Sequence, residues 1–410
     1  MKAPQWKITA AATALAALIA GSRVSFGLFL SPINTATGLG MASISLAAAV
    51  GQLAAGLALP FVGALARRHG TARVISVGAC VLAASTALVA LANGLLALVL
   101  LMLVVSAAGT AVASNALLLG EVSRRAPVEE RGFASGIVGA GGPAGQLLLA
   151  PLVTLLIGRE GWTAALWGVA GLALLALPLS LSFKQRARDL QAAPAAQASD
   201  GAWRDRRFWL IAASFAICGF HVAFLTVHMP GVIERCGLST AFSGVWLAIA
   251  GASNMGGSIG IGVLMRRQAS APLLMAIYAL RALAIGLFLV VPPSPAALLV
   301  FAVSMGATYM AALPPTAELL TRSFGVQRLA ALLGLIMLIH QVGGFAGAWL
   351  GGIAVEHSGS YAPLWIADMA LALLAAALQW PLRPAALPAV PRAASRARPA
   401  FGAAPARQSA

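Results

Sequence analysis

The chain has 410 residues, of which 60% are hydrophobic and only 9% are charged. Soluble proteins carry roughly 25% charged residues, so a water-soluble fold of this length could not cover its surface with so few charges. The net charge of +16 does not indicate a nucleic-acid partner, because the basic residues form short clusters between apolar runs and match no DNA- or RNA-binding motif. The composition predicts an integral membrane protein that has the lipid bilayer as its solvent.

Apolar runs that are long enough to cross a bilayer, which takes about 20 residues, follow one another along the chain. They lie at residues 8–33, 42–66, 74–93, 95–120, 133–157, 162–183, 208–230, 240–265, 271–291, 296–320, 327–355 and 361–382. The sequence therefore predicts an all-α membrane protein with twelve transmembrane helices. The basic N-terminus followed by residues 8–20 is also typical of a signal peptide. We expect it to be the first helix, because the apolar stretch continues to Pro32.

Lysine and arginine are distributed unequally between the two ends of these helices. Twenty-three of the 27 lie in the termini and in the loops on the same side, whereas only two lie in the opposite loops. The positive-inside rule then predicts that both termini are cytoplasmic. We expect the polar segment 184–207 to be a flexible cytoplasmic linker between six-helix bundles at 1–183 and 208–382. The segment 383–410, rich in Ala, Pro and Arg, is predicted to be a disordered basic cytoplasmic tail that contacts anionic lipid.

The two predicted bundles repeat each other in sequence. Four pairs of segments match in the same order, and the first two pairs are offset by 198 and 199 residues. Such order is hard to obtain by chance, so the bundles are predicted to be pseudo-symmetric copies. Three pairs are Gly21–Pro32 with Gly219–Pro230, Gly63–Arg68 with Gly262–Arg267, and Gly142–Gly145 with Gly344–Gly347. The remaining pair is Glu121, three residues before Arg124, with Glu318, four residues before Arg322.

Two parallel six-helix halves joined by a polar cytoplasmic linker are the plan of the major facilitator superfamily, which the chain resembles over residues 8–382. The loop at 63–73 resembles the family's loop signature, except that Arg67 replaces the usual aspartate. Three segments also resemble the bacterial monocarboxylate-transporter-like branch of that family. The eighth span departs from this branch, because it has Asn254 and lacks the arginine that grips the substrate carboxylate. The three segments that resemble this branch are Arg23–Phe29, Cys218–Pro230 and His340–Gly352.

Arg23 is a charged side chain inside a predicted span, which costs at least ~2.5 kcal/mol on insertion scales, so it is a candidate functional residue. It lies about ten residues before the outer end of the span, or roughly 15 Å deep. The resemblance implies that spans one and seven line a central cavity, and His221, the repeat counterpart of Arg23, is expected to face it too. A buried guanidinium suits an anionic substrate, above all a carboxylate. A structural role between helices is the alternative.

Several polar side chains within spans are weaker candidates. Histidine titrates near neutral pH, so His221, His228 and His340 are candidates for carrying a coupled proton, and His221 and His340 are also candidates for binding the substrate. A polar contact between helices is the alternative for each of them. Three uncharged residues, Asn115, Asn254 and Gln341, are candidates for hydrogen bonds to a substrate, again with interhelical bonding as the alternative. The segment 139–145 resembles in part the glycine–proline motif of proton-coupled antiporters, and close helix packing explains it equally well.

Other charges suggest structural or gating roles. Glu121 is predicted to pair with Arg68 at a cytoplasmic gate, and the repeat counterparts of these two residues are Glu318 and Arg267. Arg281 in the ninth span and Asp368 in the twelfth lie at depths that differ by only ~6 Å. They are predicted to form a structural ion pair on the lipid side of the second half.

The sequence contains no Walker loop, no Gly-x-Ser-x-Gly, no dinucleotide fingerprint and no metal-spaced His/Cys set. Three cysteines give no disulfide framework, and those within spans are interpreted as small hydrophobic residues. We therefore expect no cofactor, no metal and no enzymatic activity. The expected partners are a small-molecule substrate, protons and lipid, and the chain is expected to act as a monomer.

The predicted function is secondary active transport of a small organic anion, a monocarboxylate, by proton-coupled alternating access. The alternative is proton-coupled efflux of a drug, sugar or other non-anionic solute, although two buried arginines do not suit a cation. Arginine outnumbers lysine by 24 to 3, which is typical of a GC-rich bacterial genome. The predicted location is the bacterial cytoplasmic (inner) membrane, which the chain crosses many times.

Overall fold

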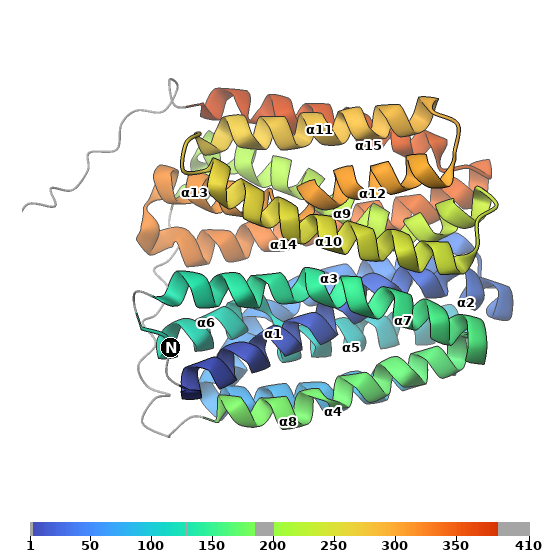
Figure 1. Ribbon diagram of the computed structural model, residues 1–410, viewed down its shortest axis with the longest axis horizontal. Coiled ribbons are helices and arrows are strands. Elements are labelled where there is room, and N and C mark those ends of the chain that lie inside the picture. The colour runs from blue at the N-terminus through green and yellow to red at the C-terminus, as the bar shows by residue number, and fades with distance from the viewer. Residues whose placement is uncertain (1–2, 128–129, 185–200, 384–410) are drawn as a thin grey trace, which may run out of the picture.

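The computed structural model describes residues 3–127, 130–184 and 201–383, and all regular structure in these ranges is helical (Figure 1). The first part contains α1 (Ala3–Val24), η1 (Ser25–Phe29), α2 (Leu30–Thr37), α3 (Met41–His69), α4 (Thr71–Val89), α5 (Leu95–Ala113), α6 (Asn115–Arg125), α7 (Arg131–Leu174), α8 (Ala176–Ser180) and η3 (Leu181–Phe183). The second part contains η5 (Ala202–Arg204), α9 (Arg206–Arg235), α10 (Thr240–Leu264), α11 (Ser270–Val290), α12 (Pro295–Tyr309), α13 (Leu313–Phe324), η6 (Val326–Arg328), α14 (Leu329–Ser358), α15 (Ala362–Leu378) and η7 (Trp380–Leu382). Most of the predicted linker and tail lies outside the described residues.

Eleven helices in the described residues are long and apolar enough to cross a membrane. One of them, Arg131–Phe183, has 53 residues. If straight, it would be about 80 Å long, well beyond the ~30 Å of a bilayer core. Gly161 interrupts it with non-helical backbone angles (φ 84°, ψ 165°), and the sequence predicts one span on each side of this glycine. The total of twelve spans stays a prediction.

Large apolar side chains are exposed along the outside of the helices. Leu96 (71% exposed), Ile259 (69%) and Val290 (76%) are examples. A soluble monomer rarely exposes large apolar patches, whereas lipid favours such a surface. Together with the eleven long apolar helices, this surface describes a multi-pass membrane protein.

In the first half, glycines bring the backbones of α1 and α7 into contact. A Cβ atom on Gly141 would lie 2.5 Å from the carbonyl oxygen of Thr13, and one on Gly145 would lie 1.9 Å from that of Ala17. Any larger residue at these positions would push the two helices apart. Of the two interpretations of segment 139–145, close packing therefore accounts for Gly141 and Gly145.

The second half repeats this arrangement between α9 and α14. A Cβ atom on Gly343 would lie 1.9 Å from the carbonyl oxygen of Ala216, and one on Gly347 would lie 2.3 Å from that of Phe220. Small residues of this kind allow membrane helices to approach closely, which favours association without a hydrophobic driving force. The glycines that match in sequence thus occupy equivalent contacts in the two halves.

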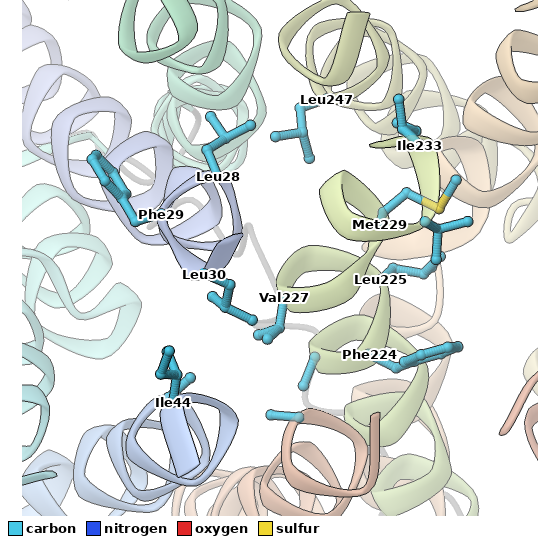
Figure 2. Close-up of a cluster of buried hydrophobic side chains, with 14 of the residues drawn as sticks. Leu28, Phe29, Leu30, Ile44, Phe224, Leu225, Val227, Met229, Ile233 and Leu247 are labelled. Atoms are coloured by element: carbon cyan, nitrogen blue, oxygen red, sulfur yellow. The ribbon is translucent and has the colours of Figure 1, made fainter. Parts of the chain in front are cut away.

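The two halves share one hydrophobic core at the end of the bundle opposite to the termini, here called the distal end (Figure 1). Figure 2 shows Leu30 and Ile44 of the first half together with Val227 and Phe224 of the second half in this cluster. Towards the other end, here called the terminal end, the buried clusters belong to one half each. The described halves are therefore joined through a common core at the distal end.

A carboxylate of the second half caps a helix of the first half at the distal end. Glu356, near the end of α14, accepts a hydrogen bond of 2.7 Å from the backbone N–H of Ala42. Ala42 is the second residue of α3, so the carboxylate satisfies an N–H group that the helix leaves free and interacts favourably with the helix dipole. One turn earlier in α14, Gly352 packs against Ser45, since a Cβ atom on this glycine would lie 2.5 Å from the Ser45 Cβ.

Replacing Gly145 by alanine is expected to destabilise the protein, because the new Cβ atom would overlap the Ala17 carbonyl. Overpacking of this kind costs about 1–3 kcal/mol. Gly139→Ala is a matched control, since it lies on the same helix and a Cβ atom there meets nothing within 4 Å. Thermal unfolding in detergent should show a lower melting temperature for G145A than for G139A. Equal melting temperatures would contradict the packing role of Gly145.

Replacing Glu356 by glutamine is expected to loosen the distal end, because the neutral amide loses its attraction to the N-terminus of α3. A helix cap contributes about 1 kcal/mol, so the ratio of distally open to distally closed molecules should rise about fivefold. A cysteine introduced at the buried Ser45 reports this change through its rate of labelling by an impermeant maleimide from the distal side.

The labelling requires Cys80 and Cys236 to be replaced, whereas the buried Cys218 is retained. Glu160→Gln is the control, because Glu160 is an exposed carboxylate near the Gly161 turn. Faster labelling in E356Q than in E160Q supports the cap. The same labelling rate in both variants would show that the cap does not hold the distal end closed.

Candidate functional site

Three membrane helices are interrupted near the middle of the bundle. The helix that starts the chain passes from α1 into the 3-10 turn η1, directly after Arg23 and Val24. The chain leaves α5 through Ser114, which has extended backbone angles (φ −70°, ψ 136°), before α6 begins. It leaves α12 before Ala312 and enters α13 at a pair of prolines, which cannot donate backbone hydrogen bonds. Ser114 and Ala312 are 198 residues apart, the offset of the sequence repeat, and paired breaks of this kind indicate the binding site in repeat-built transporters.

Arg281 of α11 closes the break after α12. Its Nη2 donates to the carbonyl oxygens of Thr308 (2.5 Å) and Tyr309 (3.2 Å), and its Nε donates to the Thr308 hydroxyl (3.2 Å). These carbonyls lie at the C-terminus of α12, where helical acceptors lack partners and a cation is favourable. Asn254 of α10 satisfies another backbone group at this break, because its Oδ1 accepts from the backbone N–H of Met310 at 3.2 Å. Asn254, a predicted substrate ligand, is thus buried and engaged in a structural bond.

Arg23 is hydrogen-bonded to a neutral partner at the boundary of the two halves. Its Nη2 donates to Oε1 of Gln52 on α3. From the second half, Nε2 of Gln341 donates to the backbone oxygen of Gln52 at 3.1 Å, and Oε1 of Gln341 lies 3.1 Å from Nδ1 of His340. The structure therefore brings together three predicted site residues, Arg23, His340 and Gln341, through Gln52, which the sequence analysis missed.

The side chain of Arg23 is exposed although it lies in the middle of a membrane helix. Its partner Gln52 also accepts a hydrogen bond from Gln341 of the second half, so the exposed guanidinium borders a space at the boundary between the halves. Among the described residues, no carboxylate lies within ion-pair distance of Arg23. Arg23 thus keeps guanidinium donors that can bind an anion in that space.

Tyr309, at the broken end of α12, lies close enough to Arg23 for an electrostatic interaction. It also borders a small cavity of about 10 Å³ together with Gln146 of α7 and Thr226 of α9. This volume approaches what one water molecule needs. Gln146 donates from Nε2 to the backbone oxygen of Leu247 at 2.9 Å, which links α7 to α10 of the other half. Tyr309 and Gln146 were both missed by the sequence analysis, which weighed no tyrosine or glutamine apart from Gln341.

Cys218 extends the polar contacts into the second half. Its sulfur accepts from Nη1 of Arg281 at 3.3 Å, and it lies close enough to His340 for an electrostatic interaction. The interpretation of Cys218 as a simple small hydrophobic residue was therefore wrong. A continuous series of contacts leads from Arg23 through Gln52, Gln341, His340 and Cys218 to Arg281.

The prediction that Arg281 and Asp368 form an ion pair was wrong, because each of them bonds to other groups. Asp368 of α15 is buried and bonds through Oδ1 to Nδ1 of His221 on α9, whereas Arg281 bonds to α12 and Cys218. Their similar depth in the membrane did not reveal which way each side chain points around its helix. The expectation that His221 faces the central space with Arg23 was also wrong, because His221 is 0% exposed and turned towards α15.

His228 and Asn115 lie away from these contacts. Nε2 of His228 is 2.6 Å from the backbone oxygen of Ala348, and the hydroxyl of Tyr361 is 3.5 Å from its Nδ1. A tyrosine hydroxyl can donate a hydrogen bond, so Tyr361 can serve as the donor to His228. Both ring nitrogens are thus engaged in contacts between helices. Asn115 begins α6 next to the break and is exposed.

The predicted gate charges lie towards the terminal end of the bundle. Glu121 is buried and bonds to the Thr71 hydroxyl and to Arg124 and Arg125 of its own helix. The proposed partner Arg68 is exposed, so pairing between Glu121 and Arg68 was wrong. In the second half Glu318 pairs with Arg322 at 2.8 Å, again within one helix, and Arg267 is exposed. Each carboxylate is therefore paired within its own half.

Broken helices, matched packing in two halves and a polar space between the halves are features of a membrane transporter. The chain belongs to the Major Facilitator Superfamily, which matches residues 12–293. Monocarboxylate transporter 13 from Rattus norvegicus is 26% identical over 365 residues, which cover 87% of this chain and 83% of the relative. The Bos taurus protein of the same name is 25% identical over 370 residues (87% and 84%). The predicted membership of this superfamily is confirmed.

Solved transporter structures share the fold. A nucleoside transporter, NupG, has a TM-score of 0.78 at 15% identity and covers 93% of this chain and 99% of its own. A D-xylose-proton symporter has a TM-score of 0.75 at 16% identity (92% and 98%). A bacterial homolog of the human lysosomal transporter Spinster, inward-facing and unoccupied, has a TM-score of 0.73 at 16% identity (93% and 97%). At these identities the likeness shows the fold alone.

Proposed function

We propose that the protein is a secondary active transporter of a small monocarboxylate in the bacterial cytoplasmic membrane, with a proton as the coupled ion. The observation that carries this proposal is Arg23, an exposed cation at mid-bundle with a neutral hydrogen-bond partner. A guanidinium binds a carboxylate through two parallel hydrogen bonds. The relatives named monocarboxylate transporter 13 support the same class of substrate.

The substrate site lies between the halves, with Arg23 and Gln52 on one side and His340 and Gln341 on the other. An anion bound to Arg23 contacts the side chain that holds Gln52 of α3, whose backbone oxygen accepts from Gln341 of the opposite half. Binding can therefore alter how the halves fit together, which is what alternating access requires.

The arrangement of the cores supports an inward-facing conformation. The halves share a core and the Glu356 cap at the distal end, whereas the cores are separate at the terminal end. With the termini in the cytoplasm, as the basic loops predict, the distal end is the outer end. Transport then requires the distal contacts to open and the terminal ends to close around the loaded site.

Arg23→Gln is expected to reduce carboxylate uptake strongly, because glutamine keeps polarity but loses the charge-assisted hydrogen bonds. Such bonds contribute about 1.5–3 kcal/mol, so the apparent kcat/KM should fall about tenfold to a hundredfold. The measurement is uptake of labelled lactate, pyruvate and acetate into proteoliposomes, with and without an inward proton gradient.

Arg235→Gln is the matched control, because Arg235 ends α9 and donates to the backbone oxygen of Gly359, away from Arg23. Gradient-stimulated uptake in the wild type and in R235Q, lost in R23Q, supports the proposal. Flux of these carboxylates that is unchanged in R23Q would make Arg23 structural. Absence of carboxylate flux in folded wild type would instead favour efflux of a non-anionic solute, and nucleosides and D-xylose would be tested next.

A further inference from the structure

The interior of the second half holds an unusual set of buried ionisable side chains. Asp368 and His221 are 0% exposed, and Arg281 is 1% exposed. In the described part of the first half, the corresponding buried charge is Glu121, which lies at the terminal end and is paired with the exposed Arg124 and the half-buried Arg125. Charges in a membrane interior are costly and are kept where they serve transport or its coupling.

Arg281 and Asp368 balance each other in charge although they do not touch. The guanidinium of Arg281 donates hydrogen bonds to the end of α12 and to Cys218. It also interacts electrostatically with Asp368. With His221 neutral, the sum of these charges is +1 − 1 = 0. With His221 protonated, the sum becomes +1. The protonation state of His221 therefore decides whether the interior of this half is neutral or positive.

His221 and Asp368 form a hydrogen-bonded pair in which one atom of each partner remains unused. Nδ1 of His221 bonds to Oδ1 of Asp368, whereas Nε2 of His221 and Oδ2 of Asp368 are buried and have no partner in the part of the chain that the structure describes. Because an ionised carboxylate only accepts, Nδ1 carries the hydrogen and Nε2 of the neutral ring presents a free lone pair. Buried polar atoms without partners are rare, and the pair is distinguished by having one on each of two ionisable side chains that bond to each other.

We propose that the His221–Asp368 pair is the site that binds and releases the coupled proton. This inference rests on the proposed function. The proton binds to Nε2 of His221, the ring becomes imidazolium, and Asp368 stays ionised and stabilises it through the existing bond. Release of the proton from Nε2 restores the neutral ring, so no other group has to change its charge.

The surrounding helices place few competing groups near the pair. On α9 these are Cys218 and His228, on α11 Tyr278 and Arg281, and on α14 His340; α10 carries no titratable residue and α15 none besides Asp368. His228 has partners on both ring nitrogens, and Tyr278 donates to the backbone oxygen of Ser214 at 2.9 Å. Cys218 and His340 belong to the contacts that lead to Arg23. His221 is thus the histidine of this group with a free, buried nitrogen.

The pair is mechanically connected to the substrate site. His221 follows Cys218 by three residues on α9, so the two lie about one helical turn apart. Between them, Gly219 packs on the carbonyl of His340, since a Cβ atom there would lie only 1.9 Å from that oxygen. A shift of α9 on protonation is therefore transmitted to His340 and Gln341. A positive charge in the second half and an anion at Arg23 also favour each other electrostatically, which couples the two binding events.

His221→Gln tests this assignment in full-length protein in proteoliposomes. The variant is expected to lose the stimulation of labelled lactate, pyruvate or acetate uptake by a proton gradient. Its exchange of internal for external substrate needs no net proton movement and should persist, with a lower apparent affinity because the proton no longer favours binding of the anion. His228→Gln on the same helix is the matched control and should keep the stimulation. Asp368→Asn, which has nearly the same shape, replaces H221Q if that variant does not fold and should show the same loss.

A second readout needs no substrate. Potentiometric titration of the purified protein in detergent between about pH 5 and pH 8 should show one proton fewer bound per molecule in H221Q than in the wild type or in H228Q. Uptake that remains gradient-stimulated in H221Q, or proton binding equal to that of the wild type, would overturn the assignment. If the wild type transports none of the carboxylates, the proposed function fails, while the titration still decides whether the pair binds a proton.

Discussion

The interior of a bilayer offers no water, so each polar group there must find its partner within the protein. The contacts at the middle of this bundle follow from that constraint. Where α12 ends before α13, its last carbonyls accept from Arg281, and Asn254 accepts from the backbone N–H of Met310. A break in a membrane helix is thus tolerated because a cation and an amide from neighbouring helices replace the missing hydrogen bonds. The same cation supplies the positive charge that Asp368 balances in the second half.

Glycine makes these polar contacts possible by setting the distance between helices. Gly145 and Gly347, at matching positions, allow α7 to lie on α1 and α14 to lie on α9 with backbone atoms in contact. Because α1 carries Arg23 and α14 carries His340 and Gln341, their positions depend on this packing. Rigid helix pairs of this kind can move as units, so a transporter can open one end and close the other without rebuilding its interior.

The sequence allowed the superfamily to be predicted, and it singled out the repeat and Arg23, because each leaves a strong signal. A cation in an apolar span is conspicuous, and glycines at a constant offset reveal the two halves. Gln52 and Tyr309 were missed because uncharged polar residues are common in membrane helices and sequence does not show which face they occupy. Asp368 was given the wrong partner for a related reason, since depth fixes only the position along the helix axis. The orientation of α15 about its axis places Asp368 towards His221, and this orientation is determined only by how the helices pack.

The division of charge between the halves gives a reason why an anion and a proton would move together. Arg23 and the anion lie on the side of the first half, while the proposed proton site lies within the second half. A proton on His221 leaves the second half with a net positive charge, which is unfavourable in a medium of low dielectric constant unless a negative charge is nearby. An anion held by Arg23 supplies that charge at the boundary between the halves. Because thermodynamic coupling is reciprocal, the anion raises the affinity for the proton by the same factor by which the proton raises the affinity for the anion.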